Sequence, residues 1–258
     1  MSYRIKRNIF APKLQHLTEN DMWQNIHLLC FDKCNFHCGF CNVRNRKRAD
    51  YHEYSTAGFE LAVQVLMQYG RWFKFTGGEP TLNPSLARDL SIVKRQGGMT
   101  FLDTNGSKPQ VLRQLLGENL VDVLALSIKG LSMEEALRVA EIKNGALCWD
   151  NVLESLGEAN QHPEVSSMLT IVLEEGKATD SCFAAIKQLM DPFPNVRLKI
   201  NNLRENPETY ARNLSANDPD VLGAQIARFV EENPEYHGRV VYEPTQASVT
   251  DYEQLLFY

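Results

Sequence analysis

Residues 26–41 read IHLLCFDKCNFHCGFC, a short apolar run that leads directly into a loop with three cysteines. The run from Ile26 to Phe31 is rich in large apolar side chains, which is typical of a buried strand. The loop carries Cys34, Cys38 and Cys41 with the spacing C-x3-C-x2-C. The stretch therefore predicts a strand with chemistry at its carboxyl end, where parallel α/β sheets carry their active sites.

The same pattern of strand and helix recurs along the chain. Further strand-like runs are 72–76, 99–103, 122–128, 168–173 and 196–200. Segments with helical spacing are 56–69, 84–96, 109–116, 132–139, 151–160 and 179–190. Six alternations predict an α/β fold with a parallel sheet and right-handed crossovers, and both an open doubly wound sheet and a barrel fit them.

Polar and glycine-rich residues follow each predicted strand, as expected for an active-site edge. They are Gly77-Gly78-Glu79, Thr104-Asn105-Gly106, Lys129-Gly130, Glu174-Glu175-Gly176 and Asn201-Asn202. After about residue 205 the pattern lapses, with a helix-like segment at 221–230 and a strand candidate at 239–242. We interpret residues 1–25 as an N-terminal extension, 26–205 as the core, and 206–258 as a C-terminal cap of the same domain.

Composition and charge exclude several classes of protein. The 258 residues are 43% hydrophobic and 23% charged, which suits one large globular domain. No long apolar run or secretory signal is present, so we expect a cytoplasmic protein without a membrane span. The net charge of -5 makes nucleic-acid binding improbable. The basic run Arg44–Arg48 is the exception: it is either a solvated loop or a local site for an anionic substrate or an acidic electron donor.

Three thiols on one loop indicate a metal centre, and two kinds of centre fit them. Zinc needs a fourth ligand, for which His27 or His37 is available. An iron-sulfur cube held by three cysteines instead leaves one iron open to another ligand. Cys30, Cys148 and Cys182 stand apart from the loop and are interpreted as buried thiols.

A second motif, Phe75-Thr76-Gly77-Gly78-Glu79-Pro80, follows the next predicted strand. Together with the cysteine loop, in which Phe40 precedes Cys41, it resembles the radical S-adenosylmethionine (radical SAM) superfamily. The resemblance implies a partial (β/α)6 TIM-like barrel and a 4Fe-4S cluster on Cys34, Cys38 and Cys41. It also implies that S-adenosylmethionine binds the open iron and is cleaved to a 5'-deoxyadenosyl radical, which abstracts a substrate hydrogen.

The resemblance also implies roles in binding S-adenosylmethionine for the residues of these two motifs. Gly77 and Gly78, which lack side chains, would let the backbone approach the methionine moiety closely, and Pro80 belongs to the same cofactor-binding motif. Glu79 would accept a hydrogen bond from its ammonium group. Phe40 would lie against the adenine.

Residues 101–107 and 120–129 are similar to glycyl-radical-enzyme activating proteins. This similarity places Asp103, Thr104 and Asn105 at the cofactor site, with Asp103 and Thr104 beside a monovalent cation, and pairs Lys129 with the cofactor carboxylate. Two positions depart from that family. Ser127 replaces an aspartate, which weakens a cation site, and Asn201 stands where many activating proteins carry a histidine.

Three functions are compatible with these patterns. The first is the activation of a glycyl radical enzyme, with flavodoxin or ferredoxin as electron donor. The second is radical chemistry on a small molecule, nucleotide or peptide. The third is a non-catalytic zinc protein. Cofactor turnover separates the first two, because activation uses about one cofactor per partner site.

Overall fold

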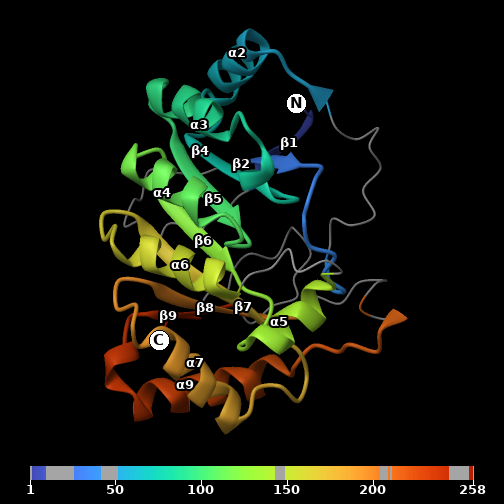
Figure 1. Ribbon diagram of the computed structural model, residues 1–258, viewed down its shortest axis with the longest axis vertical. Coiled ribbons are helices and arrows are strands. Elements are labelled where there is room, and N and C mark those ends of the chain that lie inside the picture. The colour runs from blue at the N-terminus through green and yellow to red at the C-terminus, as the bar shows by residue number, and fades with distance from the viewer. Residues whose placement is uncertain are drawn as a thin grey trace.

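One open sheet with seven parallel strands forms the body of the molecule (Figure 1). The computed structural model describes residues 2–9, 26–41, 52–142, 149–203, 209, 211–243 and 256–257. The parallel strands are β2 (Ile26–Phe31), β4 (Trp72–Gly77), β5 (Met99–Thr104), β6 (Val123–Ser127), β7 (Ser166–Leu173), β8 (Arg197–Asn202) and β9 (Val240–Glu243). They pair in sequence order across the sheet. This arrangement confirms the predicted α/β class with parallel strands.

Both edges of the sheet are extended by antiparallel strands. On one side β1 (Ser2–Ile9) pairs with β2, and the two-residue strand β3 (His52–Glu53) pairs with β1. On the other side β10 (Leu256–Phe257) pairs with β9. The sequence interpretation assigned no strand to residues 1–25, because Ser2–Ile9 contains Arg4, Lys6 and Arg7 among its apolar residues.

The six predicted parallel strands agree with the observed ones to within two residues at each end. The strand candidate at 239–242 is a seventh parallel strand, since Leu198 pairs with Val240 and Ile200 with Tyr242. Part of the predicted cap thus continues the alternation of strand and helix. The boundary near residue 205 between core and cap stays a prediction.

Helices cover one face of the sheet (Figure 1). They are α2 (Thr56–Leu66), α3 (Leu86–Arg95), α4 (Pro109–Gly117), α5 (Met133–Ala140), α6 (Trp149–Asn160), α7 (Asp180–Met190) and α9 (Pro219–Glu232), with short 3-10 turns η2 (Pro80–Leu82) and η3 (Pro234–Tyr236). Ser55, Ser132, Thr179 and Asp218 cap four of the helices by accepting a backbone N–H in the first turn. Such caps satisfy donors that the helix itself leaves unpaired, which is why these helices begin where they do.

The two faces of the sheet carry different side chains. The helix-covered face is continuously apolar and belongs to the main core, with Leu29, Phe75 and Leu102 fully buried. On the opposite, inner face, Trp72, Phe101 and other apolar side chains form a smaller cluster. Because side chains alternate along a strand, Lys74 and Asp103 project from the inner face above this cluster. The inner face therefore becomes polar toward the carboxyl ends of the strands.

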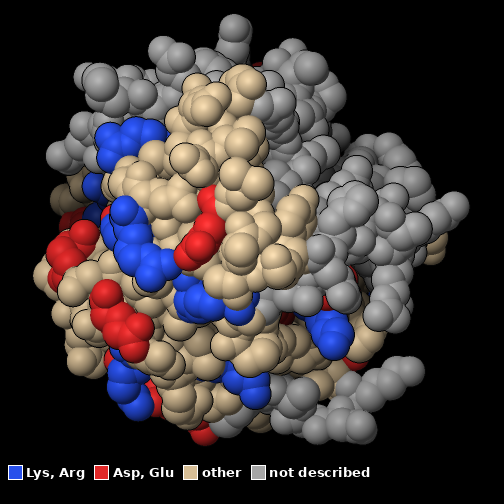
Figure 2. Space-filling model, turned by 90° about the horizontal axis from the view of Figure 1, so that it is seen from above, with Lys and Arg blue, Asp and Glu red and all other residues tan. Residues whose placement is uncertain are grey.

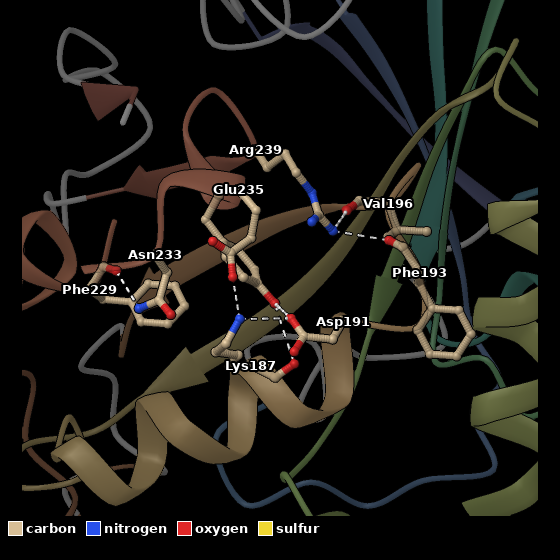
Figure 3. Close-up of polar contacts among 9 residues, drawn as sticks. Lys187, Asp191, Phe193, Val196, Phe229, Asn233, Glu235 and Arg239 are labelled. Atoms are coloured by element: carbon tan, nitrogen blue, oxygen red, sulfur yellow. Dashed lines mark hydrogen bonds and ion pairs between the residues drawn. The ribbon is translucent and has the colours of Figure 1, made fainter. Parts of the chain in front are cut away.

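A polar cluster joins α7, η3 and β9 (Figure 3). Lys187 forms ion pairs with Asp191 and Glu235, while the Tyr236 hydroxyl donates to Asp191 Oδ1 at 2.9 Å. Arg239 donates to the carbonyls of Phe193 and Val196 and lies over the Tyr236 ring. These contacts fix the last parallel strand to the helix layer.

Basic and acidic side chains are intermixed on the described part of the face in Figure 2. Several of the protein's basic groups are paired, as in Arg95 with Glu60 and Lys94 with Asp122. The described part of this face has no broad basic stripe of the kind that nucleic-acid binding requires.

Candidate active site

The three cysteines of the predicted cluster motif lie on the loop that leaves β2. Cys34 is exposed, Cys41 is half-buried and Cys38 is buried. The backbone N–H of Cys41 donates to the Cys38 carbonyl at 3.1 Å and closes a turn. The N–H of Phe36 donates to Cys34 Sγ at 3.4 Å. One short loop thus carries all three thiols at the carboxyl edge of the parallel sheet.

The turn after β4 packs directly on the cysteine loop. Gly78 N donates to the Phe31 carbonyl at 2.9 Å, and Glu79 N donates to the Lys33 carbonyl at 2.6 Å. Gly77 has a φ of 101°, a backbone conformation that residues with side chains rarely adopt. A Cβ on Gly77 would overlap the backbone at the end of β2, and one on Gly78 would overlap the backbone of Lys33 in the cysteine loop. The structure therefore explains both glycines by the close approach of two protein segments.

Glu79 joins this turn to the loop after β5. Its side chain is 2% exposed and accepts hydrogen bonds from Thr81 N, Thr81 Oγ1, Thr104 Oγ1 and Asn105 N. Burial raises the pKa of Glu79, although these bonds oppose the rise. The sequence predicted that Glu79 accepts from an ammonium group of the cofactor. Here the carboxylate instead receives four bonds from the protein.

Asn35, Asn105 and Ser107 connect the cysteine loop to the loop after β5. Asn105 Nδ2 donates to Asn35 Oδ1 at 2.9 Å, and Asn35 Nδ2 donates to Ser107 Oγ at 2.9 Å. Asn105 was predicted to lie at the cofactor site, and the structure places it in contact with the cysteine loop. Asn35 was not singled out, because a single polar residue between two cysteines gives no signal by itself.

The second half of the cysteine loop is held by α5 and by the segment before α9. His37 N donates to the Ala140 carbonyl at 2.9 Å, at the C-terminal end of α5. The Arg212 guanidinium lies against Gly39 and forms an ion pair with Glu141. Sequence reasoning missed Arg212 and Glu141, because they are distant from the cysteines in sequence and belong to no motif.

Lys129 lies between the cysteine loop and the end of β6. Its ammonium donates to Ser127 Oγ at 2.6 Å and is 5.6 Å from the centre of the Phe40 ring. Its positive charge also opposes the rise that burial causes in the pKa of Cys38. The structure thus brings together Phe40, Ser127 and Lys129, all of which were predicted to lie at the cofactor site.

The residues predicted to surround a monovalent cation do not fit one. Asp103 Oδ2 is 2.7 Å from Lys74 Nζ and accepts from Thr76 Oγ1 at 2.9 Å. Thr104 points instead to Glu79, and Ser127 is bonded to Lys129. Because a lysine ammonium already neutralises Asp103, a cation at this position is not supported.

Two buried oxygens on the inner face, Thr170 Oγ1 and Asn201 Oδ1, have no hydrogen-bond partner among the described residues. Both lie near the carboxyl edge, where Thr170 pairs with Ser127 on one side and with Lys199 on the other. A buried polar atom without a partner is costly, so these oxygens are suited to contact a polar ligand.

A pocket of about 550 Å³ opens beside the cysteine loop. Phe40 and Lys129 line one side, and Ile171, Leu173 and Leu203 provide apolar walls. The N-terminal turns of α5 and α7, together with Arg212, complete the lining. The volume suits an organic molecule of cofactor size, and the mixture of apolar walls with a few charged groups is typical of such sites.

The three thiols suit an iron-sulfur cluster better than zinc. His27, one of the two predicted fourth ligands, is fully buried, and its Nε2 bonds with the Gly70 carbonyl at 3.0 Å. Among the described residues, no three Cys, His, Asp or Glu side chains lie close enough together to bind one metal ion. Three soft thiolates on one loop are a natural donor set for iron-sulfur ligation that leaves one iron open.

Burial raises the pKa of the Cys34 thiol to about 11, and Glu79 and the other two cysteines act in the same direction. Burial also raises the pKa of Cys38. Because metals bind the thiolate form, loading of this loop must release protons.

Several predicted features lie elsewhere. The basic run Arg44–Arg48 and Cys148 fall outside the described residues. Cys30 is buried in β2, and Cys182 on α7 lines the pocket rather than the cysteine loop.

The profile of the Radical SAM superfamily matches residues 28–180, from the cysteine loop to the start of α7. The chain belongs to the radical SAM superfamily. Membership implies a 4Fe-4S cluster and S-adenosylmethionine as cofactors, as predicted from the two motifs. Radical SAM enzymes also require a reductant.

Similar curated proteins differ in their activities. A probable GTP 3',8-cyclase of Thermococcus kodakarensis is 27% identical over 170 residues, which are 63% of this chain and 53% of that protein. A putative glycyl-radical enzyme activating enzyme of Methanocaldococcus jannaschii is 28% identical over 97 residues, which are 37% of this chain and 40% of that protein. A 7-carboxy-7-deazaguanine synthase of Neisseria meningitidis is 36% identical over 78 residues, 30% of this chain and 34% of that protein. The chain thus spans roughly a third to a half of the length of these relatives, and its similarity to activating proteins is one of several.

Solved structures share the fold. SuiB of Streptococcus suis bound to S-adenosylmethionine has a TM-score of 0.61 at 16% identity, over 84% of this chain and 51% of that one. TYW1 with a lysine-pyruvate adduct has a TM-score of 0.57 at 15% identity, over 96% of this chain and 90% of that one. No helix in the described ranges combines the length and apolar character needed to cross a bilayer.

Proposed function

We propose that this radical SAM protein reductively cleaves S-adenosylmethionine and abstracts hydrogen from a small anionic molecule of the nucleotide class. The observation that carries the proposal is the pocket beside the cysteine loop, whose lining includes the basic side chains of Arg138, Lys177 and Arg212 besides the groups that we assign to the cofactor. It is a concave site whose volume suits a small organic molecule. Relatives named for GTP and for a nucleotide support the same substrate class.

In this proposal Cys34, Cys38 and Cys41 hold a 4Fe-4S cluster. Bound there, the cluster supplies the single electron with which S-adenosylmethionine is split into methionine and a 5'-deoxyadenosyl radical. The protein's own task is to bind, orient and exclude water. Gly77, Gly78 and Pro80 shape the turn that rests on the cysteine loop.

In this proposal the cofactor is held by groups at the carboxyl edge of the sheet. We assign the adenine to the apolar side of the pocket, between Phe40 and the walls formed by Ile171 and Leu203. Lys129 is placed to neutralise the methionine carboxylate. Asn201 and Thr170 supply oxygens for polar groups of the bound molecules.

Anaerobic purification tests the cofactor part of the proposal. We expect about four irons and four sulfides per chain, and 5'-deoxyadenosine after reduction with dithionite in the presence of S-adenosylmethionine. The Cys38→Ala variant loses both, whereas Asn195→Ala, which removes a side chain that bonds with Asn160 away from the site, keeps both. Bound zinc, or cleavage that survives in Cys38→Ala, would contradict the proposal.

A second candidate is the activation of a glycyl radical enzyme, supported by the similarity to an activating protein. Turnover separates the two. With a small substrate, 5'-deoxyadenosine accumulates over many cycles, whereas an activating protein forms about one equivalent per partner site. A panel of nucleoside triphosphates that never stimulates cleavage, together with stimulation by a glycyl radical enzyme, would favour the second candidate. Flavodoxin or ferredoxin is the proposed electron donor in either case.

A further inference from the structure

Asn35 closes a ring of hydrogen bonds beside Cys34. Asn105 Nδ2 donates to Asn35 Oδ1, Asn35 Nδ2 donates to Ser107 Oγ, and Ser107 N donates to Asn105 Oδ1 at 3.0 Å. The side chains of Asn35 and Asn105 each bond with both other residues, and Ser107 takes part through its hydroxyl and its backbone N–H. Of the three residues in the ring, Asn35 belongs to the cysteine loop, and Asn105 and Ser107 belong to the loop after β5.

The rest of the ring rests on rigid parts of the fold. Asn105 N donates to Glu79 Oε2 at 2.7 Å, and Asn151 on α6 donates to the Ser107 carbonyl. Ser155, also on α6, donates to the Gly106 carbonyl at 2.8 Å. The loop after β5 is thereby fixed to helix α6 and to the turn at Glu79, and Asn35 transmits that rigidity to the cysteine loop.

The backbone around Asn35 carries a bond that bears on the cluster. Phe36 N, the next amide in the chain, donates to Cys34 Sγ at 3.4 Å. Rotation of the peptide between Asn35 and Phe36 would turn this N–H away from the sulfur. Hydrogen bonds to the cysteine sulfurs are among the factors that set the reduction potential of iron-sulfur clusters.

We propose that Asn35 is a positioning residue: its bonds to Asn105 and Ser107 fix the Cys34 end of the loop, so that the thiol is preorganised and Phe36 N–H points at its sulfur. The effect on the cluster rests on the proposed function. The effect on the loop does not, because it depends only on bonds between protein atoms.

Amide hydrogen exchange in the iron-free protein is the first measurement. In Asn35→Ala we expect the Phe36 amide to exchange about tenfold faster, the change that the loss of one hydrogen bond of ordinary strength produces in a local opening equilibrium. Asn105→Ala should do the same, and the double variant should exchange no faster than either single one, because each breaks the same ring. Asn195→Ala is the matched control, since its amide bonds only with Asn160 at the other end of the sheet.

The reduction potential of the loaded protein is the second measurement. Loss of the N–H···S bond removes a dipole that favours the reduced cluster, so Asn35→Ala should have a lower potential than the wild type and Asn195→Ala an unchanged one. If Asn35→Ala does not fold, Asn105→Ala replaces it, because it removes two bonds of the same ring and leaves the residues of the cysteine loop unchanged.

Unchanged exchange at Phe36 in Asn35→Ala, or additive effects of Asn35→Ala and Asn105→Ala, would overturn the proposal. An unchanged reduction potential in Asn35→Ala would overturn the proposed effect of Asn35 on the cluster. Failure of the proposed function looks different, since a wild-type protein that binds no iron leaves the exchange results in the iron-free protein unaffected.

Discussion

Gly78 lies against the backbone of Lys33 so closely that a Cβ on Gly78 would overlap the Lys33 carbonyl oxygen. The same segment donates from Glu79 N to that carbonyl. The two motifs of the sequence, the three cysteines and the glycine pair, are therefore parts of one packed unit. A change in the second motif must displace the first.

We predict that Gly78→Ala loses most of its iron while the sheet stays folded. The added methyl group meets backbone rather than a movable side chain, so the cysteine loop has to shift. Iron analysis and circular dichroism measure the two effects. Gly157→Ala is the control, because nothing lies within 4 Å of its Cβ position in helix α6. It should keep its iron and gain about 0.5–1 kcal/mol in free energy of unfolding.

Removal of the positive charge of Lys129 should weaken cofactor binding. Lys129→Met keeps the length of the side chain but loses the ammonium that donates to Ser127 and lies over Phe40. We expect the dissociation constant for S-adenosylmethionine in the iron-loaded protein to rise about tenfold, a loss of about 1.4 kcal/mol. Lys177→Met tests the alternative of a general charge effect, as Lys177 also lines the pocket. Equal losses in both variants would argue against a direct role of Lys129.

The Lys74–Asp103 pair should make stability depend on pH. Burial raises the pKa of Asp103, but Lys74 and Thr76 outweigh it and hold the pKa below the ordinary value of 3.8. The stabilisation is therefore complete above pH 3.8 and is lost as the pH falls through the lowered pKa. In the iron-free protein at neutral pH, the free energy of unfolding of Asp103→Asn should be about 1 kcal/mol lower than that of the wild type. Urea unfolding from about pH 7 to about pH 3 checks whether the gap to wild type narrows, and a constant gap would contradict the prediction.

The cluster in Figure 3 should contribute to stability without affecting the cysteine loop. Tyr236→Phe removes the hydroxyl that donates to Asp191 and leaves the buried ring in place. A loss of about 1 kcal/mol in free energy of unfolding is expected, the ordinary value of one hydrogen bond. Iron content and cofactor cleavage should stay at the wild-type level. Reduced iron in this variant would mean that β9 influences the site from the opposite end of the sheet.

Local patterns were sufficient for the parallel part of the fold. Strands buried on both faces read as apolar runs, and amphipathic helices repeat their apolar residues at helical spacing, so the alternation is visible in the chain itself. The first strand was missed because Ser2–Ile9 is rich in basic residues. The strand is defined by its pairing with residues 17 to 28 positions away in β2, and no local pattern reports that pairing.

The sequence alone determined the family, the parallel α/β class and the chemistry of the cysteine loop, because residue type and short spacing carry that information. Only the tertiary structure decided what each polar residue contacts. It turned Glu79 into a buried link, paired Asp103 with Lys74, bonded Asn35 to Asn105, and brought Glu141 and Arg212 to the loop. These contacts join residues that are far apart in the chain, and they depend on strand register and on which face of the sheet a side chain leaves. Strand register and the direction of a side chain are not encoded in a local motif, because both are determined by tertiary packing.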